Sequence, residues 1–374
     1  MRLDRRPFWQ RRFAETGQGR FITVFLLYPL SLIYRLLVES RYLLYRWRVL
    51  PTRKLPFKLV CVGNLTTGGT GKTPTVEYVA RELKGAGLRV AVLSRGYGGK
   101  QERGLDIVSD GKTVLLSQGD SGDEPYLLAH RLEGIPVLVG RNRYESGKMA
   151  YEHFGTQVAV LDDGYQHIQL NRDMNILLVD GREGFGNGHL FPLGSLREPL
   201  TGLGRAHHFL ITKSERWDRV QAVEETLRCW NPGATIFRGR YEPEGLFDPT
   251  AKKRNRLEDL KGRKVLAFAG LANPGYFLEI LESLGATLVG HIVFPDHHRY
   301  TEGDLGAIRK TMSHAEWVVT TEKDMVRLEG LGVEGLPLRV LQIKMHISDE
   351  DAFKRALFAG LGIEDTLALN QNTV

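Results

Sequence analysis

Short apolar runs alternate with longer segments of mixed polarity along most of the chain. Runs of this kind, only a few residues long and bounded by polar or glycine-containing segments, are typical of buried strands. The runs predicted as strands are 58–63, 88–94, 136–139, 157–161, 175–180, 264–270, 287–294 and 317–321. The intervening segments predict helices over 75–83, 124–132, 144–154 and 274–284. Because strands alternate with helices, the pattern predicts an α/β fold with a parallel sheet covered on both faces.

The same pattern divides the chain into parts. A Gly/Pro-rich segment, 181–199, interrupts the first set of strands, and a polar, basic, proline-containing stretch over 242–263 precedes the second set. We therefore predict a larger lobe over 55–241, a linker over 242–263 and a second, smaller α/β lobe over 264–374. Residues 1–54 form a separate N-terminal arm.

The arm has an apolar centre. Fourteen residues without a charge lie between Arg20 and Arg35. As a helix they would span about 21 Å, which is short of the roughly 30 Å hydrocarbon core of a bilayer. Pro29 would kink such a helix. We therefore expect the segment to lie in a membrane surface rather than to cross it.

The next segment of the arm, 35–48, has the pattern of a basic amphipathic helix. Together with Ile33 just before it, its apolar positions at near-helical spacing are Leu36, Leu37, Leu44 and Trp47. Arginines suit anionic headgroups and aromatic rings suit the interface, so we predict a membrane-associating helix. Two alternatives are a signal peptide beginning at Arg5 and Arg6, which lacks a small-residue cleavage site, and a helix docked on the protein's own core.

Composition and charge narrow the function classes. Apolar residues at 42% and charged residues at 25% fit a globular protein and exclude disorder, collagen-like repetition and polytopic membrane insertion. The net charge of +7 alone would suggest a nucleic-acid partner. However, residues 1–54 carry 12 Lys+Arg and 3 Asp+Glu, so the arm has a net charge of +9 and the body −2. This distribution indicates an anionic membrane surface as partner and argues against nucleic acid.

The two cysteines, Cys61 and Cys229, are too few for a disulfide framework. The sequence contains no Cys/His cluster with the spacing of a zinc site. We expect a reducing, cytosolic compartment.

A phosphate-binding loop follows the first predicted strand and opens a helix. Glycines let backbone N–H groups surround phosphate oxygens, and the helix N-terminus favours negative charge. Lys72 is expected to meet the β- and γ-phosphates, and the Thr73 hydroxyl to ligate Mg²⁺. Thr66 stands where the strict pattern has glycine, and a purely structural turn is the alternative. The residues expected to contact the nucleotide are Thr67, Gly68, Gly69, Thr70, Gly71, Lys72 and Thr73.

Two acids, Asp162 and Asp163, end an apolar strand. This arrangement places a carboxylate beside the magnesium of a nucleotide in such a loop. Adjacent strand residues point to opposite faces, so the two should differ in role unless the strand has already ended. Capping of a turn or helix is the alternative. Glu124 is assigned to the same metal region.

A possible proton acceptor lies before another helix. Asp123 and Glu124 precede a proline in what should be the first helical turn. Asp123 either caps this helix or, polarised by a partner, removes a proton from an acceptor hydroxyl. His297, directly after a strand of the second lobe, is a candidate partner. Histidine in such a loop is more often structural than catalytic.

Two arginines are candidate anion contacts. Arg143 follows a strand, and Arg197 closes the Gly/Pro-rich segment. Either could stabilise the transferred phosphate or hold an anionic acceptor. Solvated surface pairs are the alternative.

As a set, these residues resemble the tetraacyldisaccharide 4′-kinases, which phosphorylate the lipid A precursor. The matching motifs are Val62-Gly-Asn-Leu-Thr-Thr-Gly-Gly-Thr-Gly-Lys-Thr-Pro74, Leu93-Ser-Arg-Gly-Tyr-Gly98, Gly122-Asp-Glu-Pro125, Val139-Gly-Arg-Asn-Arg143, Leu161-Asp-Asp-Gly-Tyr-Gln-His167, Leu196-Arg-Glu-Pro199, Phe294-Pro-Asp-His297 and Thr321-Glu-Lys-Asp324. They run in order across 62–324, and the basic arm is similar to the family's membrane-associating N-terminus. One departure is Ser195, where the family motif has proline.

The resemblance implies a P-loop NTPase-like larger lobe and an ATP- and Mg²⁺-dependent kinase. Its acceptor is the 4′-hydroxyl of a tetraacylated glucosamine disaccharide 1-phosphate, at the cytoplasmic face of the inner membrane of a Gram-negative bacterium. By position, Lys72 and Thr73 serve the nucleotide and metal, Asp162 and Asp163 the metal region, and Asp123 with His297 the proton. Asp163 contacting the acceptor stays an open alternative.

Two other functions fit parts of the pattern. A membrane-recruited ATPase switch of the partitioning type would explain the loop, the acids and the arm, but not the motifs around His297 and Arg197. A small-molecule kinase or ligase with a merely structural arm is the second alternative.

Overall fold

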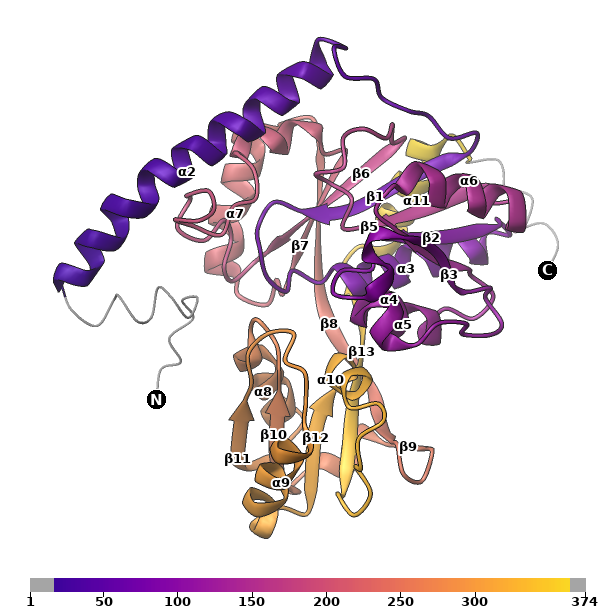
Figure 1. The fold of residues 1–374 in the computed structure, drawn as a ribbon. Coiled ribbons are helices and arrows are strands. Elements are labelled where there is room, and N and C mark those ends of the chain that lie inside the picture. The colour runs from indigo at the N-terminus through magenta and orange to yellow at the C-terminus, as the bar shows by residue number, and fades with distance from the viewer. Residues whose placement is uncertain (1–16, 364–374) are drawn as a thin grey trace.

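The computed structural model describes residues 17–363, which form two lobes connected by one continuous sheet (Figure 1). Residues 1–16 of the predicted arm, where a signal peptide would begin, and residues 364–374 lie outside the described range. The predicted α/β fold with a mainly parallel sheet is confirmed.

The larger lobe is built on parallel strands. They are β1 (Lys58–Asn64), β2 (Val90–Ser94), β3 (Leu105–Ser109), β4 (Val137–Gly140), β5 (Val158–Asp162), β6 (Met174–Asp180) and β7 (His208–Thr212), in the order β3-β4-β2-β5-β1-β6-β7. All neighbours in this set are parallel except β3, which runs antiparallel to β4. The carboxyl ends of the parallel strands therefore share one edge, where ligands bind in open α/β sheets.

Helices cover both faces of this sheet. They are α3 (Lys72–Gly85), α5 (Asp123–Arg131), α6 (Arg143–Phe154), α7 (Trp217–Trp230) and α11 (Glu350–Leu361). Val60 and Val62 of β1 belong to the apolar cluster that includes α3, α5 and α11, whereas Leu59 and Cys61 belong to the one that includes α6 and α7. This alternation is what a strand buried on both faces requires.

The smaller lobe repeats the arrangement on a smaller scale. Its strands are β10 (Lys264–Ala269), β11 (Thr287–Val293), β12 (Trp317–Thr321) and β13 (Leu338–Ile347), and its helices are α8 (Pro274–Ser283), α9 (Glu302–Thr311) and α10 (Glu322–Arg327). One cluster packs α8 against β10 and the opposite cluster packs α9 against it. All eight apolar runs identified in the sequence are strands of the two lobes.

The region predicted as a linker differs from expectation. Strand β8 (Thr235–Asp248) pairs in parallel with β7 through its first residues and antiparallel with β13 through the rest. β9 (Lys253–Asn255) then pairs back on β8. The first part of 242–263 is therefore sheet. Its alternation of polar and apolar residues reflects a strand that is exposed in part, not a loop.

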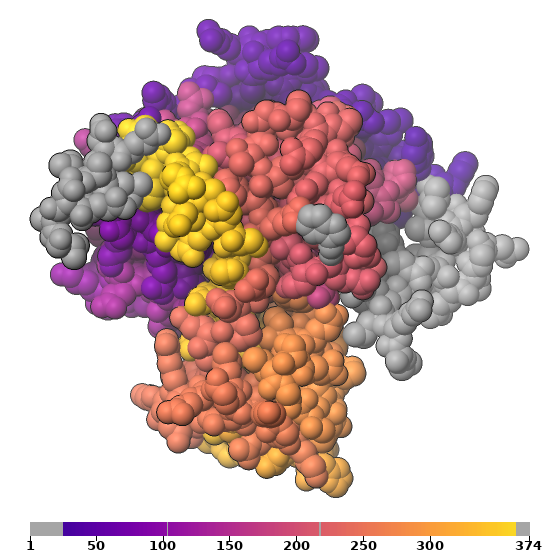
Figure 2. All heavy atoms as spheres, turned by 180° about the vertical axis from the view of Figure 1, so that it is seen from behind, coloured from indigo at the N-terminus to yellow at the C-terminus, as the bar shows by residue number. Residues whose placement is uncertain are grey.

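The C-terminal segment also departs from the predicted boundaries. After β13, α11 returns to the larger lobe, where Phe353 and Leu357 join the cluster that includes α3. Figure 2 shows this yellow segment lying on the larger lobe, above the orange smaller lobe. The chain thus crosses between the lobes twice, on β8 and on β13. The assignment of all of 264–374 to the smaller lobe is wrong at its C-terminal end.

The arm contains one continuous helix, α2 (Gly17–Arg46), with Pro29 inside it (Figure 1). One side is docked: Ser31 Oγ donates to Leu190 O at 2.9 Å and Tyr34 Oη donates to Arg197 O at 2.8 Å. The exposed large apolar side chains of α2 and the turn after it are Phe25, Leu26, Tyr28, Leu30, Leu32, Ile33, Leu36, Leu37, Leu43, Leu44, Trp47 and Val49. Within residues 17–363, no helix is both long enough and apolar enough to cross a membrane.

The position of α11 generates a stability prediction. Phe353 is fully buried and makes edge-to-face contacts with Tyr78 of α3 and Phe237 of β8. Phe353→Ala should therefore lower the free energy of unfolding of the full chain by about 3–5 kcal/mol in urea denaturation. The control Leu115→Ala, at an exposed site, should change it by less than about 0.5 kcal/mol. Equal effects of the two would contradict the packing of α11.

Candidate functional site

The loop after β1 has the geometry of a phosphate-binding loop. It ends at Gly71, which is left-handed (φ 87°) and precedes α3, and Gly68 also has a positive φ of 116°. A Cβ at Gly71 would meet the Tyr241 hydroxyl at 2.7 Å, so a side chain there would be strained in two ways. Thr70 N donates to Gly68 O at 3.0 Å and closes the turn. The loop follows β1 and opens α3, as the sequence predicted, and so lies at the carboxyl edge of the sheet.

Lys72 and Thr73 begin α3 and are buried, with 8% and 5% of their surface exposed. Lys72 Nζ donates to Asn64 Oδ1 at 3.3 Å and lies 3.8 Å from Asp163 Oδ1. The ammonium group therefore lies near the loop and near a carboxylate, without a close ion pair. Such a cation is available to bind phosphate oxygens.

Asp162 and Asp163 have different surroundings and different hydrogen-bond partners. Asp162 is the last residue of β5 and is 1% exposed; its Oδ2 accepts from Ser94 Oγ at 2.8 Å, but its Oδ1 has no hydrogen-bond partner among the described residues. Burial, reinforced by the charges of Glu124 and Asp163, raises the pKa of Asp162. A buried, unpartnered carboxylate oxygen with a raised pKa marks a place for a cation.

Asp163 follows the strand in a left-handed conformation (φ 49°). Both of its carboxylate oxygens accept from Arg197 Nη1, at 2.9 and 2.8 Å. Burial alone would raise the pKa of Asp163, but the charges of Lys72 and Arg197 outweigh it and lower this pKa. The strand has ended at Asp162, so the two acids do take different environments. Arg197, expected at an anionic ligand, is paired with Asp163 instead.

Asp123 is the first residue of α5, and Gly122 is the N-cap without any side-chain capping bond. Asp123 therefore does not cap the helix. Its Oδ1 accepts from Gln118 Nε2 at 2.6 Å, and its Oδ2 accepts from Arg327 Nε at 2.7 Å. His297 Nδ1 lies 3.3 Å from the same Oδ2.

His297 thus meets Asp123 from the other lobe, as the pairing inferred from the sequence required. It has a left-handed backbone (φ 58°), and its ring lies edge-on to that of Tyr97, 5.9 Å between centroids. The hydrogen bond with Asp123 raises the pKa of His297. In turn, burial would raise the pKa of Asp123, but His297 and Arg327 outweigh it and hold this pKa well below its usual range.

Sequence reasoning missed the two cations that complete this contact. Arg327 donates to Asp123, and Lys323 Nζ donates to Glu124 Oε1 at 2.6 Å. The charge of Lys323 lowers the pKa of Glu124 against the effect of burial. Both cations belong to α10, four residues apart, and so lie on one helix face. Lys323 lies in the motif Thr321-Glu-Lys-Asp324. Its spacing of four residues from Arg327 could have indicated that the two cations share a helix face.

Arg143 begins α6 and lies within electrostatic reach of Asp162 and Asp163. It is 4% exposed, and its Nη1 donates to Gly140 O and Arg141 O, each at 3.3 Å. Its Nε has no partner in the described part of the chain. Burial lowers the pKa of Arg143 to about 10. A buried guanidinium with an unused donor is suited to an anion that the protein itself does not supply.

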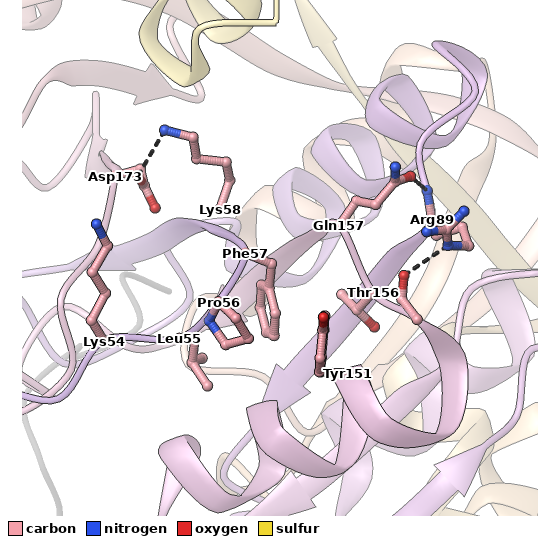
Figure 3. A pocket seen from close by; sticks show the side chains of 11 residues that line it. Lys54, Leu55, Pro56, Phe57, Lys58, Arg89, Tyr151, Thr156, Gln157 and Asp173 are labelled. Carbon is pink, nitrogen blue, oxygen red and sulfur yellow. Dashed lines mark hydrogen bonds and ion pairs between the residues drawn. The ribbon is translucent and has the colours of Figure 1, made fainter.

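None of these site residues lines the pocket of about 820 Å³ that Figure 3 shows. Its lining side chains include Lys58 at the start of β1, Arg89 just before β2, Gln157 just before β5 and Asp173 just before β6. These positions are the amino ends of the strands, opposite to the edge that carries the phosphate-binding loop. The pocket is therefore not part of the candidate site.

Comparison with known proteins gives a consistent result. The family model "Tetraacyldisaccharide-1-P 4'-kinase" matches residues 23–361. The chain is 40% identical over 343 residues to the tetraacyldisaccharide 4′-kinase of Desulfatibacillum aliphaticivorans, covering 89% of this chain and 91% of that protein. It is 42% identical over 359 residues to that of Syntrophus aciditrophicus, covering 93% and 96%. A crystal structure of LpxK from Aquifex aeolicus in complex with ATP has a TM-score of 0.73 at 33% identity, covering 91% and 99%.

The Asp123–His297 contact can be tested by titration. Asp123→Asn removes the negative charge that favours the protonated imidazole, so the pKa of His297 should fall toward its ordinary value. Histidine resonances followed by NMR across pH 4 to 9, about the range of imidazole titration, would report it. Asp304→Asn, beside His298 rather than His297, is the matched control. An unchanged pKa of His297 in the Asp123 variant would exclude the contact in solution.

Proposed function

The chain belongs to the tetraacyldisaccharide-1-P 4′-kinase family, and we propose that its phosphoryl transfer takes place where the two lobes meet. The chain is thus an ATP-dependent tetraacyldisaccharide 4′-kinase of lipid A biosynthesis. The proposed location of phosphoryl transfer rests on one observation. Asp123 of the larger lobe contacts His297 and Arg327 of the smaller lobe, on the side of the sheet that bears the phosphate-binding loop.

In this proposal the loop 67–73 holds the triphosphate of ATP. Its backbone N–H groups and the N-terminus of α3 favour the phosphates. Lys72 neutralises charge on the β- and γ-phosphates, and its distance of 3.8 Å from Asp163 leaves it free to do so. Phosphoryl transfer depends mainly on positioning and on charge neutralisation, which this loop supplies without covalent chemistry.

The residues present fit a magnesium ion. Asp162 Oδ1 is buried and unpartnered among the described residues. Thr73, which carries a hydroxyl, is the second residue of α3, directly after the loop. Across residues 17–363, no cluster of three or more His, Cys, Asp or Glu side chains could hold a metal ion. This agrees with Mg²⁺ bound by one or two protein ligands together with phosphates and water. Thr73 and Asp162, with Glu124 nearby, would hold the ion, which supplies charge stabilisation to the transferring phosphoryl group.

The proton of the acceptor hydroxyl passes to the Asp123–His297 pair. Asp123 is a weak base because Arg327 and His297 stabilise its ionised form. In a loose transition state, the hydroxyl becomes acidic only as the bond to phosphorus forms, so a weak, well-positioned base suffices. Gln118, Arg327 and His297 fix the carboxylate, which satisfies the positioning requirement. Asp163, with both oxygens on Arg197, is the less suitable acceptor.

Arg143 and Arg197 are the two arginines that still need a role in this proposal. Arg143 has a buried Nε without a partner in the described chain and is placed to receive a phosphate oxygen. Arg197 acts through Asp163, which it orients beside Lys72. We therefore assign phosphate contact to Arg143 and a supporting contact to Arg197.

The arm is proposed to bring the enzyme to its lipid substrate. An acceptor with four acyl chains stays in a bilayer, and α2 exposes a run of large apolar side chains next to arginines. Tyr34 and Ser31 fix the opposite side of α2 to the segment 189–197. We propose peripheral association with the cytoplasmic face of the inner membrane of a Gram-negative bacterium, driven by anionic lipid, with no role for nucleic acid.

The family membership does not favour the partitioning-type ATPase switch. Such a switch also gives no role to His297, which meets Asp123 across the lobes. A small-molecule kinase or ligase with a merely structural arm gives no role to the exposed apolar side of α2.

The catalytic proposal predicts the behaviour of one variant in a lipid kinase assay. The full chain, incubated with ATP, Mg²⁺ and a tetraacyldisaccharide 1-phosphate, should form the 4′-phosphorylated lipid. Lys72→Ala should lower the rate by about a hundredfold or more, because charge neutralisation at the phosphates is lost. Lys58→Ala, at the opposite end of β1, is the matched control and should keep the rate. Retained turnover in Lys72→Ala would remove the loop from the mechanism.

The membrane proposal predicts loss of vesicle binding. Leu30, Ile33 and Leu37 lie on one side of α2 and are 52%, 54% and 63% exposed. The triple change to Gln should reduce sedimentation with vesicles containing anionic lipid, because buried apolar area drives such binding. A triple Gln variant at Leu115, Tyr151 and Val289, exposed apolar residues of the body, is the control. Equal binding by both variants would contradict the assignment of α2.

A further inference from the structure

A buried lysine that the proposed mechanism does not use lies against the phosphate-binding loop. Lys213 directly follows β7, has a left-handed backbone (φ 52°) and is 2% exposed. Its ammonium group donates to Gly69 O at 2.8 Å and to the carboxylate of Asp180. The side chain therefore connects the loop to the end of β6.

The Asp180 end of this connection is fixed. Asp180 is 5% exposed, and its Oδ1 accepts from the backbone N–H groups of Arg182 at 2.9 Å and Glu183 at 3.2 Å. A buried ion pair is seldom more stable than a well-packed apolar pair of the same size. Stability alone therefore does not explain why the chain buries the Lys213–Asp180 pair. The need to hold Lys213 in place as the donor to Gly69 O does explain it.

The neighbouring residue makes a second contact with the loop. Thr212 is fully buried, and its Oγ1 donates to Thr70 O at 3.0 Å. Two successive loop carbonyls, those of Gly69 and Thr70, are thus held by two successive residues at the end of β7. In a planar trans peptide the C=O and the following N–H point in opposite directions. Fixing these carbonyls therefore directs the N–H groups of Thr70 and Gly71 away from β7, that of Thr70 toward Gly68 O at 3.0 Å.

The Thr70 N–H thus keeps the turn of the loop closed, and the Gly71 N–H belongs to the segment that surrounds phosphate in a loop of this type. Lys213 is held in place from the side of the smaller lobe as well, because its Nζ lies 6.0 Å from the ring centroid of Tyr241 and 5.6 Å from that of Tyr276. Rings at this distance attract a cation weakly. The ammonium group is thus enclosed by the loop, Asp180 and two aromatic rings.

We propose that Lys213 is a positioning residue for ATP, which presets the phosphate-binding loop by fixing the Gly69 carbonyl. Thr212 supports the next peptide in the same way. The inference rests on the proposed placement of the triphosphate in the loop 67–73. Its expected signature is weaker ATP binding with unchanged recognition of the lipid, because the lipid does not depend on this part of the loop.

The first test is Lys213→Met, which keeps an unbranched side chain as far as Cε but removes the ammonium group, and with it the donor to Gly69 O and the cation beside the two tyrosines. The KM for ATP and the dissociation constant for ATP, measured by calorimetry, should both rise about tenfold or more. The KM for the lipid should stay within about twofold. Lys58→Met, which breaks a surface pair with Asp173 at the far end of β1, should change neither. A folded Lys213→Met protein with an unchanged KM for ATP would overturn the proposal.

A second variant separates positioning from the cost of a buried charge. Lys213→Met leaves Asp180 without its cation, and the added change Asp180→Asn removes that charge. The double variant should regain thermal stability yet keep the raised KM for ATP, because Gly69 O still lacks its donor. Recovery of the KM for ATP in the double variant would assign the effect to the buried charge and overturn the proposal.

If Lys213→Met does not fold, Thr212→Val decides the question. This change is nearly isosteric and leaves no buried charge. It should raise the KM for ATP several-fold with an unchanged KM for the lipid, and an unchanged KM for ATP would overturn the proposal. Lys72→Ala separates a failure of the positioning role of Lys213 from a failure of the proposed function. If Lys72→Ala loses turnover while Lys213→Met and Thr212→Val behave as wild type, only the positioning role fails.

Discussion

The site depends on a contact between two acids and two cations that belong to different lobes. Asp123 and Glu124, at the start of α5, meet Arg327 and Lys323 of α10. Each pair is only partly exposed to solvent, so it is screened less than a surface pair. The Asp123 carboxylate that receives Arg327 also contacts His297, so the proposed proton-accepting pair depends on this contact.

The sheet determines where the two lobes can meet. Because β8 pairs with β7 at one end and with β13 at the other, the lobes share a strand instead of a loose connection. Arg131, at the end of α5, adds a second anchor: it pairs with Glu77 of α3, Glu244 of β8 and Glu322 of α10. The relative placement of α5 and α10 thus follows from sheet pairing and from a largely buried guanidinium. The charged contact at Asp123 is built on this frame.

The sequence predicted the parts of the fold in which local pattern decides the structure. Runs such as 58–63 and 175–180 are apolar at every position between their first and last residues, since strands buried on both faces need no alternation. β8 was missed because only five of its fourteen residues are buried and it carries charged residues such as Arg240 and Glu242. The segment of α11 was assigned to the wrong lobe because the local pattern over 350–361 does not indicate which apolar cluster Phe353 joins.

The same distinction holds for the site. The loop, Asp162 and Asp123 stand directly at the ends of predicted strands or at the start of a predicted helix, so their positions could be inferred from the sequence. The pairing of Arg197 with Asp163 could not, because it depends on how the segment 189–197 returns to the loop, where Thr67 N donates to Ser195 O at 2.7 Å. Ser195, the departure from the family motif, contributes to that contact through its backbone alone. Lys213 was missed because its role depends on a tertiary contact with a carbonyl group.

A double-mutant cycle on kcat shows whether Asp123 and His297 act as one unit assembled from two lobes. Asp123→Asn, His297→Gln and the double variant are compared with the wild type in the lipid kinase assay at saturating ATP and lipid. If the two side chains act as one unit, each single change lowers kcat strongly and the double variant is no worse than the more damaging single. Strictly additive losses would mean that the two side chains act independently and do not form one unit.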